Sequence, residues 1–300
     1  MIDKKGKKLI IYDSLDFFIP YMESENIDVF RLYRKRDFLV SSLKKIFLKL
    51  DLFAPFWYEK WIRNIDLYNE IIIFATKDYT FIRKIKKRNP NIKMIFWYWN
   101  PAFRMGIPKK EIYSLTDLWS FDEKDCEQYK MKFNTTFYFN NIVLPTKQIK
   151  YDCIFLGINK GRRRYLEEIN ATLNNLNIKS FFHIVPDKGE NNPNNIKAIP
   201  YKDYLELVSE SKCIIDILPE GQTGQTLRPM ESIFFEKKLI TNDRSIRDEL
   251  FFDEQNIFIL GENNISEIVA FIESPYKKIE SDVVNYYDFT NWLKRFESNE

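Results

Sequence analysis

The stretch KCIIDILPEGQTGQTLRPMESIFFEKKLITN, residues Lys212 to Asn242, decides the fold class of this chain. Its first part, Cys213 to Leu218, is short, apolar and rich in β-branched residues, as a buried parallel strand is. A loop with two glycines follows, then a helix predicted to begin near Thr226, and a second apolar strand covers Leu239 to Thr241. This order of strand, glycine loop, helix and strand is typical of an α/β sheet with parallel strands.

The glycine loop of this stretch, Gly221 to Gly224, has the features of an anion site. Glycine lets the backbone approach a ligand, and the N–H groups and positive dipole end at a helix start attract phosphate. Arg228 lies in the first helical turn, where the helix dipole disfavours a cation, which indicates that an anion lies beside it. The alternative is an ordinary surface loop with a solvated Arg228. Glu231, one turn into the helix, either accepts the hydroxyls of a ribose or is a first-turn glutamate favoured by the dipole.

A second glycine loop, Gly157 to Arg164, follows the predicted strand Tyr151 to Leu156. Ligands of doubly wound sheets bind at the carboxyl ends of the strands, and both glycine loops are expected at that edge. Lysine acts as a point charge and arginine binds phosphate through two parallel hydrogen bonds, so we expect Lys160 and Arg162 to contact a diphosphate. The loop matches neither the Walker pattern nor the GxGxxG fingerprint. Tyr201, at a later strand-to-helix turn, is expected near a nucleotide base.

Strands and helices alternate along the whole chain, and the pattern lapses and restarts near residues 144–148. Three hundred residues suit two domains of about 150 residues each. We therefore expect two tandem Rossmann-like domains, residues 1–146 and 147–282, with the helical tail 283–300 packing back on the first. Further expected features are strands over 135–139 and 196–199, and a capping box formed by Ser120 and Glu123.

Composition and charge exclude several classes of protein. The net charge of +3 is too small to indicate nucleic-acid binding. The three cysteines lack metal-ligand spacing and suit a reducing compartment. The single histidine, His183, makes a Ser-His-Asp hydrolase unexpected and is interpreted as a core residue. No signal peptide or membrane-spanning segment is recognisable, so a cytoplasmic location is expected.

The segment from Arg31 to Arg63 is unusually basic, with nine basic and three acidic residues. Residues 38–50 have a helical apolar face flanked by lysines, and Phe53, Phe56, Trp57, Tyr58 and Trp61 follow. Cationic and aromatic side chains together favour contact with an anionic membrane surface. The alternative is a core-facing helix with solvated lysines.

Two stretches of the second half, DILPEGQTGQTLRPMESIFFEKKLITN from Asp216 and YDCIFLGINKGRR from Tyr151, resemble bacterial GT-B glycosyltransferases that build lipopolysaccharide, O-antigen or capsule. SFDEKDCEQY from Ser120 and the strand ending WYWNP at Pro101 resemble the same proteins. The resemblance implies a GT-B fold with a cleft between the domains and a C-terminal helix that crosses back. It also implies a nucleoside-diphosphate sugar as donor, a lipid-linked or growing glycan as acceptor, and no cofactor or obligatory metal.

Carried onto this chain, the resemblance places the donor in the second domain and the acceptor in the first. Together with the loops, it gives this predicted nucleotide-sugar site: Gly157, Lys160, Gly161, Arg162, Tyr201, Gln222, Thr223, Gly224, Thr226, Leu227, Arg228 and Glu231. Many retaining GT-B enzymes carry a second glutamate eight positions before the ribose glutamate. Here that position is Thr223, so the stereochemical course stays open.

The catalytic candidates lie at the ends of predicted strands in the first domain. Asp13 is the candidate base for an inverting transfer, since the acceptor hydroxyl must lose a proton, and its alternative is a turn residue. Asn100 and Arg104 are expected to position donor or acceptor. Two other functions remain open: a sugar-nucleotide epimerase of GT-B shape, and a non-catalytic nucleotide-sugar-binding subunit of a transferase complex.

Overall fold

The structure is a computed structural model that describes residues 6–13, 16–34, 44, 46–219 and 225–297. The chain divides into two compact units, Met1–Thr135 with Arg295–Glu300, and Thr136–Lys294. This boundary lies before the one predicted at residue 146, because Tyr138 pairs through its backbone with Tyr287 and Phe289 of the second unit. Of the predicted tail, only residues from Arg295 onward belong to the first unit.

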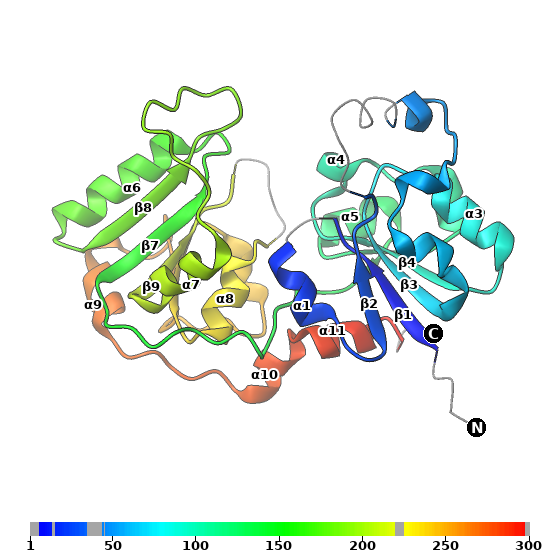
Figure 1. Cartoon of the computed structure of the whole chain (residues 1–300). Coiled ribbons are helices and arrows are strands. Elements are labelled where there is room, and N and C mark those ends of the chain that lie inside the picture. Colours follow the sequence, from blue (N-terminus) through cyan, green and yellow to red (C-terminus); the bar gives the residue numbers. More distant parts are fainter. Residues whose placement is uncertain (1–5, 14–15, 35–43, 45, 220–224, 298–300) are drawn as a thin grey trace. The chain divides into compact units, whose positions relative to one another are not determined.

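The first unit contains a parallel sheet in the order β2-β1-β3-β4-β5-β6 (Figure 1). Its strands are β1 (Lys7–Ile11), β2 (Ile27–Phe30), β3 (Tyr68–Phe74), β4 (Lys93–Tyr98), β5 (Asp117–Ser120) and β6 (Lys132–Phe133). Its helices are α1 (Ile19–Met22), α3 (Thr80–Arg88), α4 (Ala102–Met105) and α5 (Glu123–Tyr129).

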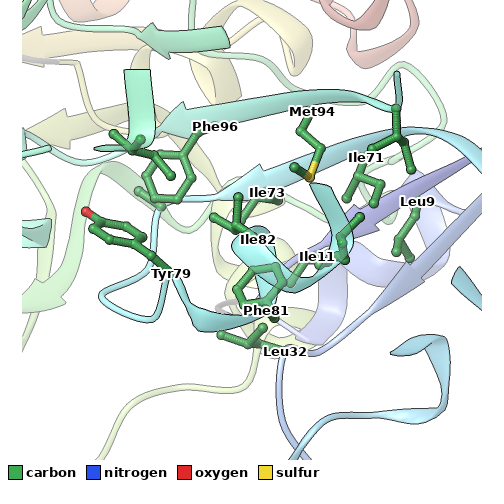
Figure 2. Close-up of a cluster of buried hydrophobic side chains, with 14 of the residues drawn as sticks. Leu9, Ile11, Leu32, Ile71, Ile73, Tyr79, Phe81, Ile82, Met94 and Phe96 are labelled. Carbon is green, nitrogen blue, oxygen red and sulfur yellow. The ribbon is translucent and has the colours of Figure 1, made fainter. Parts of the chain in front are cut away.

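Buried side chains of β1, β3 and β4 form the core of this unit on one sheet face. Leu9, Ile71, Met94 and Phe96 pack against Phe81 of α3 and its neighbours (Figure 2). Successive residues of a strand point to opposite faces, so both faces are apolar and the strands read as continuous hydrophobic runs. Such strands are typical of a parallel sheet covered on both faces.

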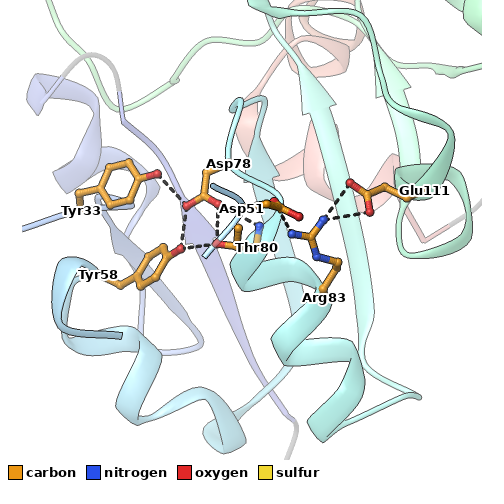
Figure 3. A network of polar contacts seen from close by, with 7 residues as sticks. All are labelled: Tyr33, Asp51, Tyr58, Asp78, Thr80, Arg83 and Glu111. Atoms are coloured by element: carbon orange, nitrogen blue, oxygen red, sulfur yellow. Dashed lines mark hydrogen bonds and ion pairs between the residues drawn. The ribbon is translucent and has the colours of Figure 1, made fainter. Parts of the chain in front are cut away.

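A buried carboxylate, Asp78, fastens the basic segment to this sheet (Figure 3). Its Oδ1 accepts the backbone N–H of Thr80 at 2.9 Å, at the start of α3. Its Oδ2 accepts the hydroxyls of Tyr33 and Tyr58, each at 2.7 Å. Burial and the charge of Asp78 raise the pKa of both tyrosines, so they stay protonated donors. Arg83 adds ion pairs to Asp51 and Glu111 in the same figure.

The second unit contains a parallel sheet in the order β11-β10-β9-β7-β8. Its strands are β7 (Tyr151–Ile158), β8 (Ser180–Val185), β9 (Ser211–Asp216), β10 (Lys238–Thr241) and β11 (Ile257–Ile259). Its helices are α6 (Arg163–Asn175), α7 (Tyr201–Ser209), α8 (Arg228–Phe234), α9 (Ile268–Glu273), α10 (Ser281–Tyr286) and α11 (Phe289–Arg295). The last residue of α11, Arg295, is assigned to the first unit.

Helices cover both faces of this second sheet. Cys213 and Ile215 of β9 pack with Leu166 of α6 and Ile268 of α9. The alternate residues, including Asp216, point to the opposite face, where Thr226, two residues before α8, contacts Asp216. The sheet is therefore doubly wound, and the predicted fold class of two Rossmann-like α/β domains is confirmed.

Three local predictions are wrong. Residues 135–139 form no strand with the first sheet, because Phe137 and Phe139 pack on Phe289 of α11 instead. Residues 196–199 are also not a strand; the carbonyl oxygen of Lys197 lies 2.7 Å from Nε2 of His183 on β8. Asp122 rather than Ser120 caps α5, accepting the N–H groups of Lys124 and Asp125.

Candidate functional site

The two strands that carry the predicted ligand loops, β7 and β9, are neighbours in the second sheet. The chain order places β8 on one side of β7 and the later strands on the other side. The change of direction therefore falls between β7 and β9. This is the topological switch point of a 2-1-3-4-5 sheet, and ligands of such sheets bind beyond the carboxyl ends of these two strands.

Five side chains gather at this point, and we call them the switch-point cluster: Tyr204, Asp216, Thr226, Arg228 and Glu231. The Thr226 hydroxyl donates to Asp216 Oδ2 at 2.9 Å, where β9 ends. The same hydroxyl accepts the backbone N–H of Arg228 at 3.1 Å. Arg228 Nη2 donates to the carbonyl oxygen of Leu156 at 2.9 Å, near the end of β7. The start of α8 is thus attached to both strands that flank the switch point.

The anion predicted beside Arg228 is present in the chain itself. Arg228 Nη1 lies 2.5 Å from Glu231 Oε2, and the Glu231 side chain is only 1% exposed. Tyr204, on α7, donates its hydroxyl to the same Oε2 atom. Its ring lies 4.5 Å from the Arg228 guanidinium. The unfavourable position of Arg228 in the helix dipole is therefore offset by Glu231, and 24% of the Arg228 side chain stays exposed.

Asp216 is a buried carboxyl group with an altered affinity for protons. Burial raises its pKa to about 6, against the opposing effects of the Thr226 hydroxyl and of the charges on Arg228 and Arg162. The charges of both arginines, which come from different loops, lower the pKa of this one carboxyl group. The switch point combines two cations with an acid that changes charge near neutral pH.

The loop between β7 and α6 places Arg162 across Gly157. A Cβ atom on Gly157 would lie 3.3 Å from the Phe155 ring and 3.6 Å from Arg162 Nη2. The guanidinium of Arg162 lies 5.3 Å from that ring and donates to the Ile158 carbonyl oxygen at 3.3 Å. Glycine at position 157 thus avoids a tight contact with the Phe155 ring, and Arg162 Nη2 lies within ordinary contact distance of the same point.

The backbone N–H groups predicted to hold phosphate in this loop already bind a carboxylate. Lys160 and Gly161 both have positive φ angles, and their N–H groups donate to the two oxygens of Asp187 at 2.9 and 3.0 Å. Glu190 supports this arrangement, because it accepts from Arg163 at 2.7 Å and from the Asp187 N–H at 2.7 Å. The loop does form an anion-binding concavity, and its occupant here is Asp187.

Two further predicted residues, Tyr201 and Leu227, lie at the starts of helices. Tyr201 begins α7, its ring packs on Tyr204 with centroids 5.8 Å apart, and its hydroxyl is hydrogen-bonded to that of Tyr138. Leu227 is the N-cap residue of α8 and its side chain makes no capping bond. Gln222, Thr223 and Gly224 lie outside the described residues.

The catalytic candidates of the first unit follow two different strands. Asp13, exposed, comes after β1, whereas Asn100 and the exposed Arg104 come after β4. Strand β3 lies between them, which separates these strand ends by roughly 10 Å. Asp125 accepts the Ala102 N–H at 2.7 Å and so fixes the segment that carries Arg104.

Several contributors escape sequence analysis. Tyr204 reads as one apolar position of an amphipathic helix, and Asp187 and Glu190 lie in a polar loop, DKGENNPNN, without a motif. Asp216 closes an apolar run and carries no signal of its own. Among the residues described, no group of His, Cys, Asp and Glu is arranged to hold a metal ion. No helix in that part of the chain has the length and apolarity to cross a membrane.

The two sheets and their switch points define a class of fold, GT-B, with two Rossmann-like domains. No family model and no curated protein matches the chain. Solved structures match over nearly its whole length. One is the UDP-GlcNAc 2-epimerase of Methanocaldococcus jannaschii, with TM-score 0.50 and 12% identity, covering 97% of this chain and 98% of that one. Another is the T4 phage protein BGT with its UDP-glucose substrate, with TM-score 0.52 and 14% identity, covering 97% and 96%.

Proposed function

We propose that the chain is a glycosyltransferase that moves a hexosyl group from a nucleoside-diphosphate sugar onto a lipid-linked or growing surface glycan such as lipopolysaccharide, O-antigen or capsule. The observation that carries this proposal is Arg228 at the switch point of the second sheet. It is partly exposed and held between the ends of β7 and α8, where a diphosphate leaving group needs a fixed cation. The GT-B fold and the UDP-glucose ligand named for the T4 phage protein support a nucleotide-sugar donor.

The leaving diphosphate is stabilised in this proposal by arginine rather than by a metal ion. Arg228 donates to the carbonyl oxygen of Leu156 and Arg162 donates to that of Ile158, so both arginines contact the end of β7. The loop Gly157 to Arg162 joins the site when a phosphate takes the place of Asp187 on the N–H groups of Lys160 and Gly161. Asp13 or the Asn100 and Arg104 segment then serves the acceptor.

The second candidate is a sugar-nucleotide epimerase, which the likeness to the Methanocaldococcus jannaschii epimerase favours. The two functions differ in their need for an acceptor. The test incubates the chain with UDP-glucose and with UDP-N-acetylglucosamine, each with and without a bacterial lipid extract. A transferase releases UDP only with the extract, whereas an epimerase changes the sugar nucleotide without it. Binding without either reaction would indicate a non-catalytic subunit and contradict the proposal.

Arg228→Ala is the variant for this assay, with Arg164→Ala as its matched control. The Arg164 side chain is 94% exposed, and its ion pair within the described residues is with Glu168, one turn further along the same helix. We expect Arg228→Ala to abolish turnover and Arg164→Ala to retain it. Equal activity in both variants would contradict the assignment of Arg228.

The transferase acts in this proposal at the cytoplasmic face of the membrane, through the segment Arg31 to Arg63. Support comes from its exposed apolar side chains, Ile46, Leu50, Leu52 and Phe56, beside basic residues such as Lys49. The test is co-sedimentation with vesicles of phosphatidylcholine with and without anionic phosphatidylglycerol. Leu50→Glu is expected to weaken binding to the anionic vesicles, and Leu250→Glu, at a residue 64% exposed in the second unit, is the control. Equal binding by both variants would exclude this surface.

A further inference from the structure

Tyr204 contacts both members of the ion pair in the switch-point cluster, Arg228 and Glu231. Its hydroxyl donates to Glu231 Oε2, and its ring lies 4.5 Å from the guanidinium of Arg228. The residue is 5% exposed, so it is too deeply buried to serve as a surface for a ligand. Its contacts to charged groups exceed what packing in a core requires.

The contacts of Arg228 define one orientation of its guanidinium. Nη1 meets Glu231 at 2.5 Å, Nη2 meets the Leu156 carbonyl oxygen at 2.9 Å, and the plane lies near the ring of Tyr204. A free arginine side chain has several rotatable bonds and loses rotamer entropy when it is fixed. This loss is already incurred in the folded protein, so a phosphate meets an arginine that is held in place.

Glu231 is placed to act through Arg228 rather than on a ligand directly. Its side chain is 1% exposed, and its Oε2 atom accepts from both Tyr204 and Arg228. A ribose hydroxyl would have to enter a site that is closed to water in this structure. The exposed part of the cluster is the arginine, at 24% of its side chain.

We infer that Tyr204 and Glu231 are positioning residues that hold the Arg228 guanidinium for a phosphate group of the ligand, an inference that rests on the proposed function. In this inference, the two residues contribute to binding the diphosphate of the ligand and not its ribose. Tyr201 supports this arrangement, since its ring stacks on that of Tyr204 at 5.8 Å.

The test compares two ligands that share the diphosphate, UDP and inorganic pyrophosphate, by isothermal titration calorimetry. Tyr204→Leu removes the ring and the hydroxyl. We expect it to lower the affinity for both ligands by a similar factor of about tenfold. Tyr204→Phe keeps the ring and is expected to recover part of that loss for both ligands. Glu231→Gln should also weaken both. Tyr165→Phe, at a residue 40% exposed on α6, is the control and should bind as the wild type does.

Three outcomes would overturn the inference. Weaker binding of UDP with unchanged binding of pyrophosphate would assign the pair to the ribose. A lower melting temperature with unchanged affinities for both ligands would reduce Tyr204 to a core residue. A wild-type protein that binds neither ligand would contradict the proposed function itself, and this outcome is distinct from the other two. If Tyr204→Leu does not fold, the same comparison is made with Tyr204→Phe and Glu231→Gln, which change few atoms.

Discussion

At the scale of single residues, the site depends on how charges are compensated inside the second unit. Arg228 is balanced by Glu231 at 2.5 Å, and Asp216 is balanced by a hydroxyl and by the more distant charges of two arginines. Burial outweighs these favourable contacts and leaves Asp216 with a raised pKa. A carboxyl group that is costly to ionise reduces stability at neutral pH, and such groups cluster at functional sites.

Asp216→Asn should make the protein more stable at neutral pH, and the gain should depend on pH. The folded pKa of Asp216 is about 6 and its ordinary value is 3.8. Between these values the folded state binds more protons than the unfolded state, so wild-type stability falls as pH rises from about 4 to about 6. The gain should therefore appear over this window and reach on the order of 3 kcal/mol above it.

Urea unfolding at pH 4, 5, 6 and 7 measures this gain. The control is Asp282→Asn, at an exposed residue of α10, for which we expect the same stability as wild type at every pH. A gain from Asp216→Asn that is the same at pH 4 and pH 7 would show that Asp216 ionises normally.

Among the secondary-structure elements, short loops at strand ends are held by buried or partly buried carboxylates. Asp187 holds the loop after β7, and Asp125 holds the segment after β4. Asp78 lies in the loop after β3 and anchors that loop by accepting the hydroxyls of Tyr33 and Tyr58. These are the positions from which ligand-binding side chains of doubly wound sheets project. The loops therefore present their side chains from fixed backbones.

Asp187→Ala removes the internal occupant of the loop at Lys160 and Gly161. If the loop takes a phosphate in its place, the variant should bind UDP several-fold more tightly, because the ligand no longer displaces a carboxylate. Calorimetry with UDP measures this change, and Lys188→Ala, at the exposed neighbouring residue, is the control. Unchanged or weaker binding would limit the diphosphate site to the α8 side of the switch point.

Asp125→Ala should destabilise the first unit by about 1–3 kcal/mol, because the buried N–H of Ala102 loses its acceptor. Chemical unfolding followed by tryptophan fluorescence measures the loss. Asp117→Ala, at an exposed position of β5, should change stability little. A loss in Asp117→Ala as large as in Asp125→Ala would remove the special role of the Ala102 contact.

At the scale of the whole molecule, the fold could be predicted because the alternation of buried strands and amphipathic helices is a local signal. Strand β9 and helix α8 are legible in the sequence around Lys212 to Asn242. The partners of the site residues were not predictable, since Tyr204, Asp187 and Asp125 act across sequence separations that no local pattern records. The strand predicted over residues 135–139 is wrong for the same reason. Phe137 packs on α11 through Phe289 and Trp292, and this distant contact leaves no local pattern in the sequence.

In the proposed function, Arg228 holds the diphosphate of a nucleotide sugar. This assignment is tested by thermal unfolding of wild type and Arg228→Ala in the presence of UDP, GDP, dTDP and CMP. A ligand present at 100 times its Kd stabilises the folded state by about 2.7 kcal/mol. We expect at least one of the nucleoside diphosphates to raise the melting temperature of the wild type, and we expect this rise to disappear in Arg228→Ala. No rise with any nucleotide, or an equal rise in the variant, would contradict it.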